Sequence, residues 1–171
     1  MGFLDGLSRL FNTGRNQKSY FQMSREELLA LSDEDFYFAM KRLNFEKLLN
    51  VNDCRNRTHR TYYIVMCFLG DVYNGGISQF FYNESREYAP YISDALKEIG
   101  SIKTRNAFDS LVDSAQIPLN DLDALQELED DETVLEKMDA FDEAFNEDED
   151  ATDCLVAYAR MHIDDLMIAG Y

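Results

Sequence analysis

The most informative part of the sequence is residues 62–83, which read YYIVMCFLGDVYNGGISQFFYN. They overlap the most apolar segment of the chain, about 57–73, which the pattern of side chains predicts to be the central helix. Asn74-Gly75-Gly76 predicts the end of that helix, because glycine accepts the left-handed conformation in which helices commonly stop. The residues from Ile77 to Tyr82 are expected to form a short helical turn.

Helix starts are marked on the N-terminal side of this stretch. Ser24 with Glu27 has the spacing of a capping box, in which a hydroxyl and a carboxylate each accept from a free backbone N–H. Ser32 with Asp35 predicts a second helix start. These signals place helices in the chain well before the central one.

Helical signals also continue on the C-terminal side. Pro90 suits the first position of a helix that runs to Ile99 and stops at Gly100. Further helices are expected over 102–115, about 121–129, 132–146 and 152–169. No segment outside the aromatic run near Tyr62 alternates with period two, so the sequence predicts an all-α fold, a single-domain multi-helix bundle.

The length of 171 residues suits one domain. We expect an N-terminal amphipathic segment and linker over 1–19, followed by a single helical domain over 20–171 with acidic helices at about 121–169. The apolar stripe near the N-terminus is expected to dock on the protein's own core or on a sister chain.

Charge is divided unevenly along the chain. The sequence has 33 acidic and 16 basic residues, a net charge of −17. Residues 1–105 hold 14 basic and 13 acidic side chains, whereas residues 106–171 hold 2 basic and 20 acidic ones. Such a surface repels nucleic acids and anionic membranes and attracts cationic proteins or metal ions. We therefore expect no direct binding of nucleic acid and no membrane association.

Three cysteines without a C-x-x-C spacing are typical of reduced thiols in a cytosolic protein. The N-terminus lacks the features of a signal peptide. The longest apolar stretch, Tyr62 to Leu69, is too short to span a bilayer. The expected location is cytoplasmic.

The sequence offers little for catalysis or cofactor binding. It contains no G-x-S-x-G nucleophile motif and no glycine-rich phosphate loop. His59 lies in a polar helix start and is expected on the surface, and His162 is expected to pair with Asp165 one helical turn on. The acidic segments lack the glycine of a calcium-binding loop. We expect no enzyme, no catalytic residue, no metal site and no cofactor.

The helix predicted over 132–146 has two distinct faces. One repeats apolar side chains at helical spacing: Val134, Met138, Phe141 and Phe145. The other repeats acids at the same spacing: Glu132, Glu136, Asp139 and Glu143. Like charges at this spacing each cost a few tenths of a kcal/mol, and Lys137 is the only cation on the helix. Two interpretations stay open, a solvated acidic face and a surface selected for a basic partner.

The charge density of the acidic region resembles that of a nucleic acid strand. Residues 121–153 hold 16 acids and one lysine. As one continuous helix they would span roughly 50 Å, or about one net charge per 3.3 Å, an upper bound. One DNA strand carries a charge about every 3.4 Å.

The segment from Asn74 to Asn83 resembles the DNA-mimic protein family, a group of small acidic bacterial helical proteins. The family hallmark is Asn-Gly-Gly-Phe-x-Gln-Phe-Phe-x-Asn, and here Ile77 replaces the phenylalanine that follows the two glycines. The resemblance covers about 60–117, which is the expected family-like core. It implies an architectural role for the hallmark residues, Asn74, Gly75, Gly76, Gln79, Phe80, Phe81 and Asn83.

The resemblance also implies a function, since the activity studied in that family is binding a DNA-binding regulator through a duplex-like acidic surface. We expect a non-enzymatic DNA mimic that occupies the DNA-binding site of a basic DNA-binding protein or transcription regulator. The alternative is an acidic protein-binding or immunity-type module for a basic partner unrelated to DNA. A homodimer is compatible with either. The candidate phosphate-mimicking residues are Asp121, Asp123, Glu127, Asp130, Asp131, Glu132, Glu136, Asp139, Asp142, Glu143, Glu147, Asp148, Glu149 and Asp150.

Overall fold

The computed structural model describes residues 19–45, 51–128, 131–147 and 150–167. These residues form helices and loops without a strand, which confirms the all-α fold. The segment expected over 1–19 lies outside the described residues except for Ser19. In chain order the elements are η1 (Tyr20–Gln22), α2 (Arg25–Leu29), α3 (Asp33–Phe45), η2 (Val51–Asp53), α4 (Arg57–Tyr82), η3 (Glu84–Tyr91), α5 (Ile92–Ile99), α6 (Ile102–Ala115), α7 (Leu122–Gln126), α8 (Glu132–Glu147), α9 (Asp150–Met161) and α10 (Ile163–Leu166), where η denotes a 3-10 helix.

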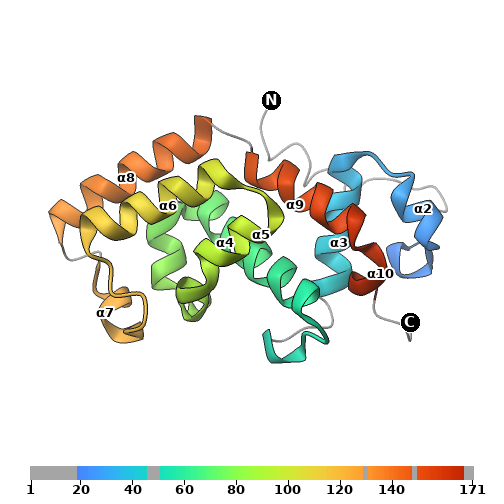
Figure 1. Cartoon of the computed structure of the whole chain (residues 1–171), viewed down its shortest axis with the longest axis horizontal. Helices are drawn as coiled ribbons and strands as arrows, with labels where there is room; N and C mark the ends of the chain where they lie inside the picture. The colour runs from blue at the N-terminus through green and yellow to red at the C-terminus, as the bar shows by residue number, and fades with distance from the viewer. Residues whose placement is uncertain (1–18, 46–50, 129–130, 148–149, 168–171) are drawn as a thin grey trace.

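Helix α4 runs through the middle of an elongated molecule (Figure 1). Helices α6 and α8 lie side by side at one end, with α7 below them in this view, and α2, α3, α9 and α10 gather at the other end. Buried apolar side chains from Leu28 in α2 to Leu166 in α10 belong to one core cluster. The core therefore continues along the whole length of the described structure.

Helix α4 contains a sharp kink at its two glycines. Gly75 has φ −162° and ψ 27°, and Gly76 has φ 79° and ψ −179°, so the helical path is broken between its two parts. We call 57–74 the first part of α4 and 77–82 the second part. Only Gly76 needs the freedom of glycine, because a positive φ is unfavourable for residues with a side chain. The predicted end of the central helix is thus confirmed, and the expected turn from Ile77 is the second part.

The two parts of α4 are tied together beyond the kink. Asn83 donates from Nδ2 to Oδ1 of Asp71 at 2.7 Å, and the hydroxyl of Ser85 donates to the other carboxylate oxygen of Asp71. Asp71 lies in the first part, whereas Asn83 caps the C-terminus of the second part. The Asp71 carboxylate therefore links the first part of α4 to the end of the second part.

Aromatic rings fill the inside of the kink. Phe68 packs edge-to-face on Phe80 and Phe108, with ring centroids 5.2 and 5.9 Å apart. Phe81 contacts Phe80 at 5.3 Å, and all four rings are buried. Such geometries add to the stabilisation from burial itself. Phe80 and Phe81 thus have the packing role that the resemblance implies.

Several local signals in the sequence are confirmed. Ser24 and Glu27 form a complete capping box at α2, and the Ser32 hydroxyl accepts from the backbone N–H of Asp35 at the start of α3. Gly100 ends α5 with φ 87°, in the left-handed region.

Two other helix boundaries differ from the expectation. Pro90 does not open α5, because it lies inside η3, where a ring without an N–H is tolerated before the helix changes type. The helix expected over 152–169 is two helices, α9 and α10, because His162 (φ −113°, ψ 24°) leaves the helical conformation.

The prediction that His59 lies on the surface is wrong. Asn56 caps α4 by accepting from the backbone N–H of His59 at 2.7 Å. The imidazole is fully buried, with Nε2 2.7 Å from Oδ1 of Asn44 on α3. It shares the core-facing side of α4 with Tyr62, one turn further on, so packing against α3 overrides the polar context of its neighbours.

Replacing a ring at the kink tests this core. Phe80→Ala should lower the free energy of unfolding by about 3–5 kcal/mol, because the ring is fully buried and leaves a cavity. Tyr82→Ala, two residues away and 52% exposed, is the control and should change it by less than about 0.5 kcal/mol. Urea denaturation of both variants measures the difference. Equal losses would contradict the packing described here.

Candidate functional site

Helix α8 presents a buried apolar face and an exposed acidic face. Val134, Met138, Phe141 and Phe145 are buried, as their spacing predicts. On the opposite side the exposed carboxylates form what we call the acidic stripe: Glu132, Glu136, Asp139 and Glu143. In the part of the chain that the structure describes, no ion pair reaches any of these four residues.

The apolar face explains how α8 tolerates the acidic stripe. Three like-charge neighbours at helical spacing cost together about 1 kcal/mol. Burial of an apolar side chain stabilises by about 1.5–3 kcal/mol, and α8 buries four of them. Packing therefore outweighs the repulsion, and the stripe does not need cations for the helix to form.

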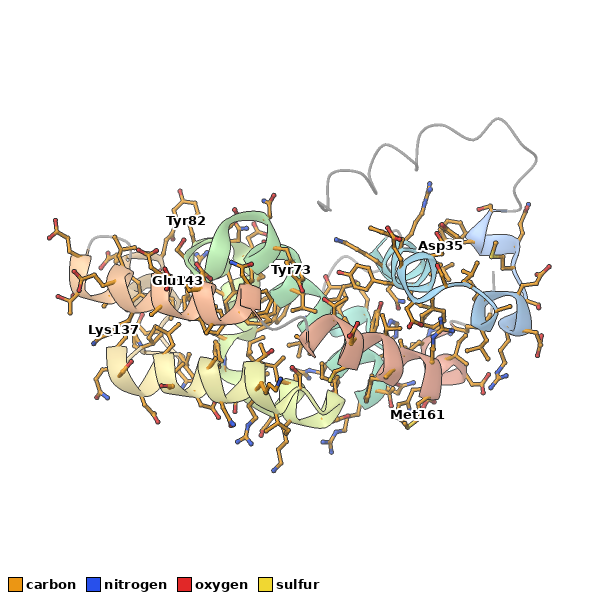
Figure 2. The ribbon with its side chains drawn as sticks, turned by 90° about the horizontal axis from the view of Figure 1, so that it is seen from above. Asp35, Tyr73, Tyr82, Lys137, Glu143 and Met161 are labelled. Atoms are coloured by element: carbon orange, nitrogen blue, oxygen red, sulfur yellow. The ribbon has the colours of Figure 1, made fainter. Side chains whose placement is uncertain are left out.

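Lys137, the lysine on α8, is turned toward α6. Its ammonium donates to the backbone carbonyl of Ser114 at 2.7 Å, next to the C-terminus of α6 at Ala115. Figure 2 shows Lys137 on the side of α8 that faces α6. A positive charge at a helix C-terminus compensates the helix dipole. Lys137 therefore stabilises α6 and does not neutralise the acidic stripe.

Arg160, the other cation of residues 106–171, is also turned inward. Its guanidinium donates to the carbonyls of Leu29 and Leu31 at 2.9 and 2.8 Å. It also donates to Oδ1 of Asp33 at 3.0 and 2.7 Å, and lies 4.3 Å from the centre of the Phe36 ring. Both cations of residues 106–171 thus bind backbone carbonyls, so they do not neutralise the acids on the outer surface of this region.

Two of the exposed acids before α8 also accept hydrogen bonds from backbone N–H groups at helix starts. Asp121 caps α7 by accepting from the backbone N–H of Ala124 at 3.1 Å. Asp131 accepts from the backbone N–H groups of Thr133 and Val134 at 2.9 and 3.3 Å. The other described acids of this region, Asp123 and Glu127, are exposed as well.

Other candidates cannot be placed with the stripe. Asp130, Asp148 and Glu149 lie outside the described residues, and the side chains of Glu147 and Asp150 are not described. Their part in partner binding stays a prediction.

Asp142 has a different environment from the one predicted for a phosphate mimic. Its carboxylate is half-buried, and Oδ1 accepts from the backbone N–H of Ile77 at 2.8 Å. Burial raises the pKa of Asp142, the charge of Asp139 raises it further, and the bond from Ile77 lowers it in part. Asp142 lies between the two faces of α8 and turns toward the kink, so we do not count it as part of the exposed face.

The glycines of the kink make room for neighbouring side-chain oxygens. A methyl group at Gly76 would collide with the Asp142 carboxylate, and one at Gly75 would collide with Oε1 of Gln79. Sequence periodicity could not reveal the contact to Asp142, because the two residues are far apart along the chain.

The charge density of the acidic stripe is lower than the upper bound derived above for one continuous helix. The acids of 121–153 are divided among α7, α8 and α9, so they do not follow one helix. From Glu132 to Glu143 the stripe is about 16 Å long, or one carboxylate per about 5.5 Å. A DNA strand has one phosphate per about 3.4 Å. A surface that imitates a strand must therefore include acids that flank the stripe.

A metal cluster and a membrane-spanning helix have no counterpart in the described parts of the chain. No three His, Cys, Asp or Glu side chains there come together as a possible metal site. No helix of those residues is long and apolar enough to cross a membrane. His162 and Asp165 form the expected pair, with Nδ1 and Oδ2 3.8 Å apart.

The family model described as DMP19-like protein matches residues 54–162, more than half of the chain. The chain belongs to the DMP19-like protein family. The match extends beyond the expected core at about 60–117 and includes the kink of α4, the acidic stripe and Arg160. Comparisons with curated proteins and with solved structures find no match.

In this DMP19-like chain, removal of an inward-facing cation should be costly. Arg160→Ala should lower the free energy of unfolding by about 1.5–3 kcal/mol, because two carbonyls and Asp33 lose a charged donor. Arg25→Ala is the control, since the partner of Arg25 among the described residues is the exposed Asp164 at 2.7 Å, and this variant should cost less than about 1 kcal/mol. Chemical denaturation of each variant decides; a loss at Arg25 as large as that at Arg160 would contradict the assignment.

The raised pKa of Asp142 predicts a pH dependence of stability. The folded chain holds the Asp142 proton more tightly than the unfolded chain, so this residue adds stability as pH falls through the raised pKa. The contribution is fully present below the ordinary pKa of aspartate and is lost as pH rises. Asp142→Asn should lack it. Urea denaturation from about pH 7 to about pH 4 should show wild type gaining stability relative to Asp142→Asn, and a constant difference would contradict the burial of this carboxylate.

Proposed function

We propose that this DMP19-like protein is a non-enzymatic DNA mimic that occupies the DNA-binding site of a basic protein. In this proposal the carboxylates of α8, together with exposed acids of the preceding segment, take the place of backbone phosphates. The lysine and arginine side chains that a DNA-binding protein directs at phosphates are the groups that would meet them.

One observation carries the proposal: α8 has four carboxylates on one exposed face with no ion pair among the described residues, while Lys137 on the same helix binds the C-terminus of α6. A surface that serves only solubility mixes charges of both signs. Here the cations lie elsewhere, which suits a surface that attracts a cationic partner over a distance.

The family match and the resemblance of Asn74–Asn83 support DNA as the ligand that is imitated. The spacing within the acidic stripe adds a requirement. Because its carboxylates are sparser than phosphates, the contact must extend to the flanking acids, of which Asp123, Glu127 and Asp131 are exposed. An extended acidic surface suits a partner whose basic side chains are spread over a long surface.

A charge-reversal variant tests the proposal. Glu136, Asp139 and Glu143 changed together to Lys reverse three of the four stripe charges and leave the apolar face intact. The partner, captured from a cell extract and purified, should be displaced from its fluorescent DNA by wild type and not by this variant. Changing the same three residues to Gln should weaken displacement less, and higher salt should weaken wild type steeply.

A charge-matched control separates the effect of the acidic stripe from the effect of the protein's net charge. Glu26, Glu34 and Asp94 are exposed acids on α2, α3 and α5. Their triple change to Lys alters the net charge equally and should leave displacement nearly intact, with melting curves confirming that both triple variants fold. Equal loss in the two variants would show that only net charge matters. Binding of the partner without displacement of its DNA would favour the alternative, an acidic module for a basic partner unrelated to DNA.

A further inference from the structure

We propose that Asp142 is a positioning residue that docks α8 on the kink of α4 and thereby directs the acidic stripe toward a row of arginines on a partner helix. This inference rests on the proposed function for the role of the stripe. It gives Asp142 no contact with the partner.

The contact has the geometry of a helix cap made by another helix. Ile77 starts the second part of α4 directly after Gly76, where a backbone N–H has no carbonyl of its own helix to bond. Oδ1 of Asp142 accepts this N–H at 2.8 Å. A carboxylate at a helix start is a strong acceptor and also suits the helix dipole. Asp142 therefore fixes α8 to a defined point of α4.

Gly76 has no side chain, and this leaves the space that the Asp142 carboxylate occupies. Its φ of 79° disfavours any side chain, and an added Cβ would collide with Oδ2 of Asp142. Two independent features, the backbone conformation and the approach of α8, thus require glycine at the same residue. The motif around the kink and the orientation of the acidic helix are one structural unit.

The orientation of α8 matters because its stripe is a row. Asp142 lies beside the stripe, one residue before Glu143 and three after Asp139, so rotation of α8 about its axis would move the whole row. The carboxylates stand at relative positions 0, 4, 7 and 11 along the helix. A partner helix with arginines at the same spacing can meet each of them, whereas scattered arginines cannot.

Two synthetic peptides test this geometry. One is a hydrocarbon-stapled helix with arginines at relative positions 0, 4, 7 and 11, and the other has the same composition with arginines distributed around the helix. The staple is needed because short isolated helices are marginal in water. Wild type should prefer the row peptide by about tenfold in Kd, measured by fluorescence anisotropy.

Variants then separate positioning from charge. Asp142→Asn keeps an acceptor oxygen and loses the charge, so the preference should stay within about twofold of wild type. Asp142→Ala and Gly76→Ala disturb the docking, and the preference should fall to about threefold or less. Gly100→Ala is the control for Gly76→Ala, because Gly100 also has a positive φ, 87°, and no described neighbour lies within 4 Å of an added Cβ. It should keep the preference.

Two results would overturn the positioning role. If Asp142→Asn loses the preference as fully as Asp142→Ala, then Asp142 acts through its charge. If Asp142→Ala keeps the preference, it positions nothing.

Amide exchange separates a failure of this inference from a failure of the proposed function. Hydrogen–deuterium exchange at Ile77 and along α8 should be at least about tenfold faster in Asp142→Ala than in wild type or Asp142→Asn. If wild type prefers neither peptide, the proposed role of the stripe in partner binding is wrong. Independently of that result, unchanged exchange in Asp142→Ala would overturn the docking contact between Asp142 and Ile77.

Discussion

The bond from the Ile77 backbone to Asp142 joins the kinked central helix to the acidic helix. The helical path breaks at Gly75 and Gly76, and the backbone N–H of Ile77 after the break donates to a carboxylate from α8. The aromatic cluster of Phe68, Phe80 and Phe108 fills the inside of the same bend. Helix α8 therefore cannot shift along α4 without breaking a charged hydrogen bond and opening the core.

The distribution of charge depends on this arrangement. The apolar face of α8 is fully used by the core, so only its opposite face is available to solvent. Lys137 and Arg160, the cations of residues 106–171, bind carbonyls of other helices. These two positive charges thus stabilise contacts between helices. They do not neutralise the acidic stripe, which has no counter-ion among the described residues. We infer that the outer surface is kept for a cationic partner.

Much of the fold could be predicted from the sequence, because its signals are local. The period of Val134, Met138, Phe141 and Phe145 identified the buried face of α8, and Ser24 and Gly100 marked real helix ends. The errors concern contacts between distant residues. Asp142 shares the spacing of surface acids, and only its bond to a residue 65 positions away shows that it faces inward. His59 has polar neighbours in sequence, yet Asn44 on α3 covers it. Helical periodicity contains no information about either partner.

The central claim is that this chain and DNA compete for one site on a basic protein. Sedimentation velocity of a mixture of this protein, its captured partner and the partner's own DNA tests it most directly. The account predicts two separate complexes, partner with DNA and partner with this protein, whose proportions follow the concentrations of the two competitors. A single species that contains all three components would contradict it.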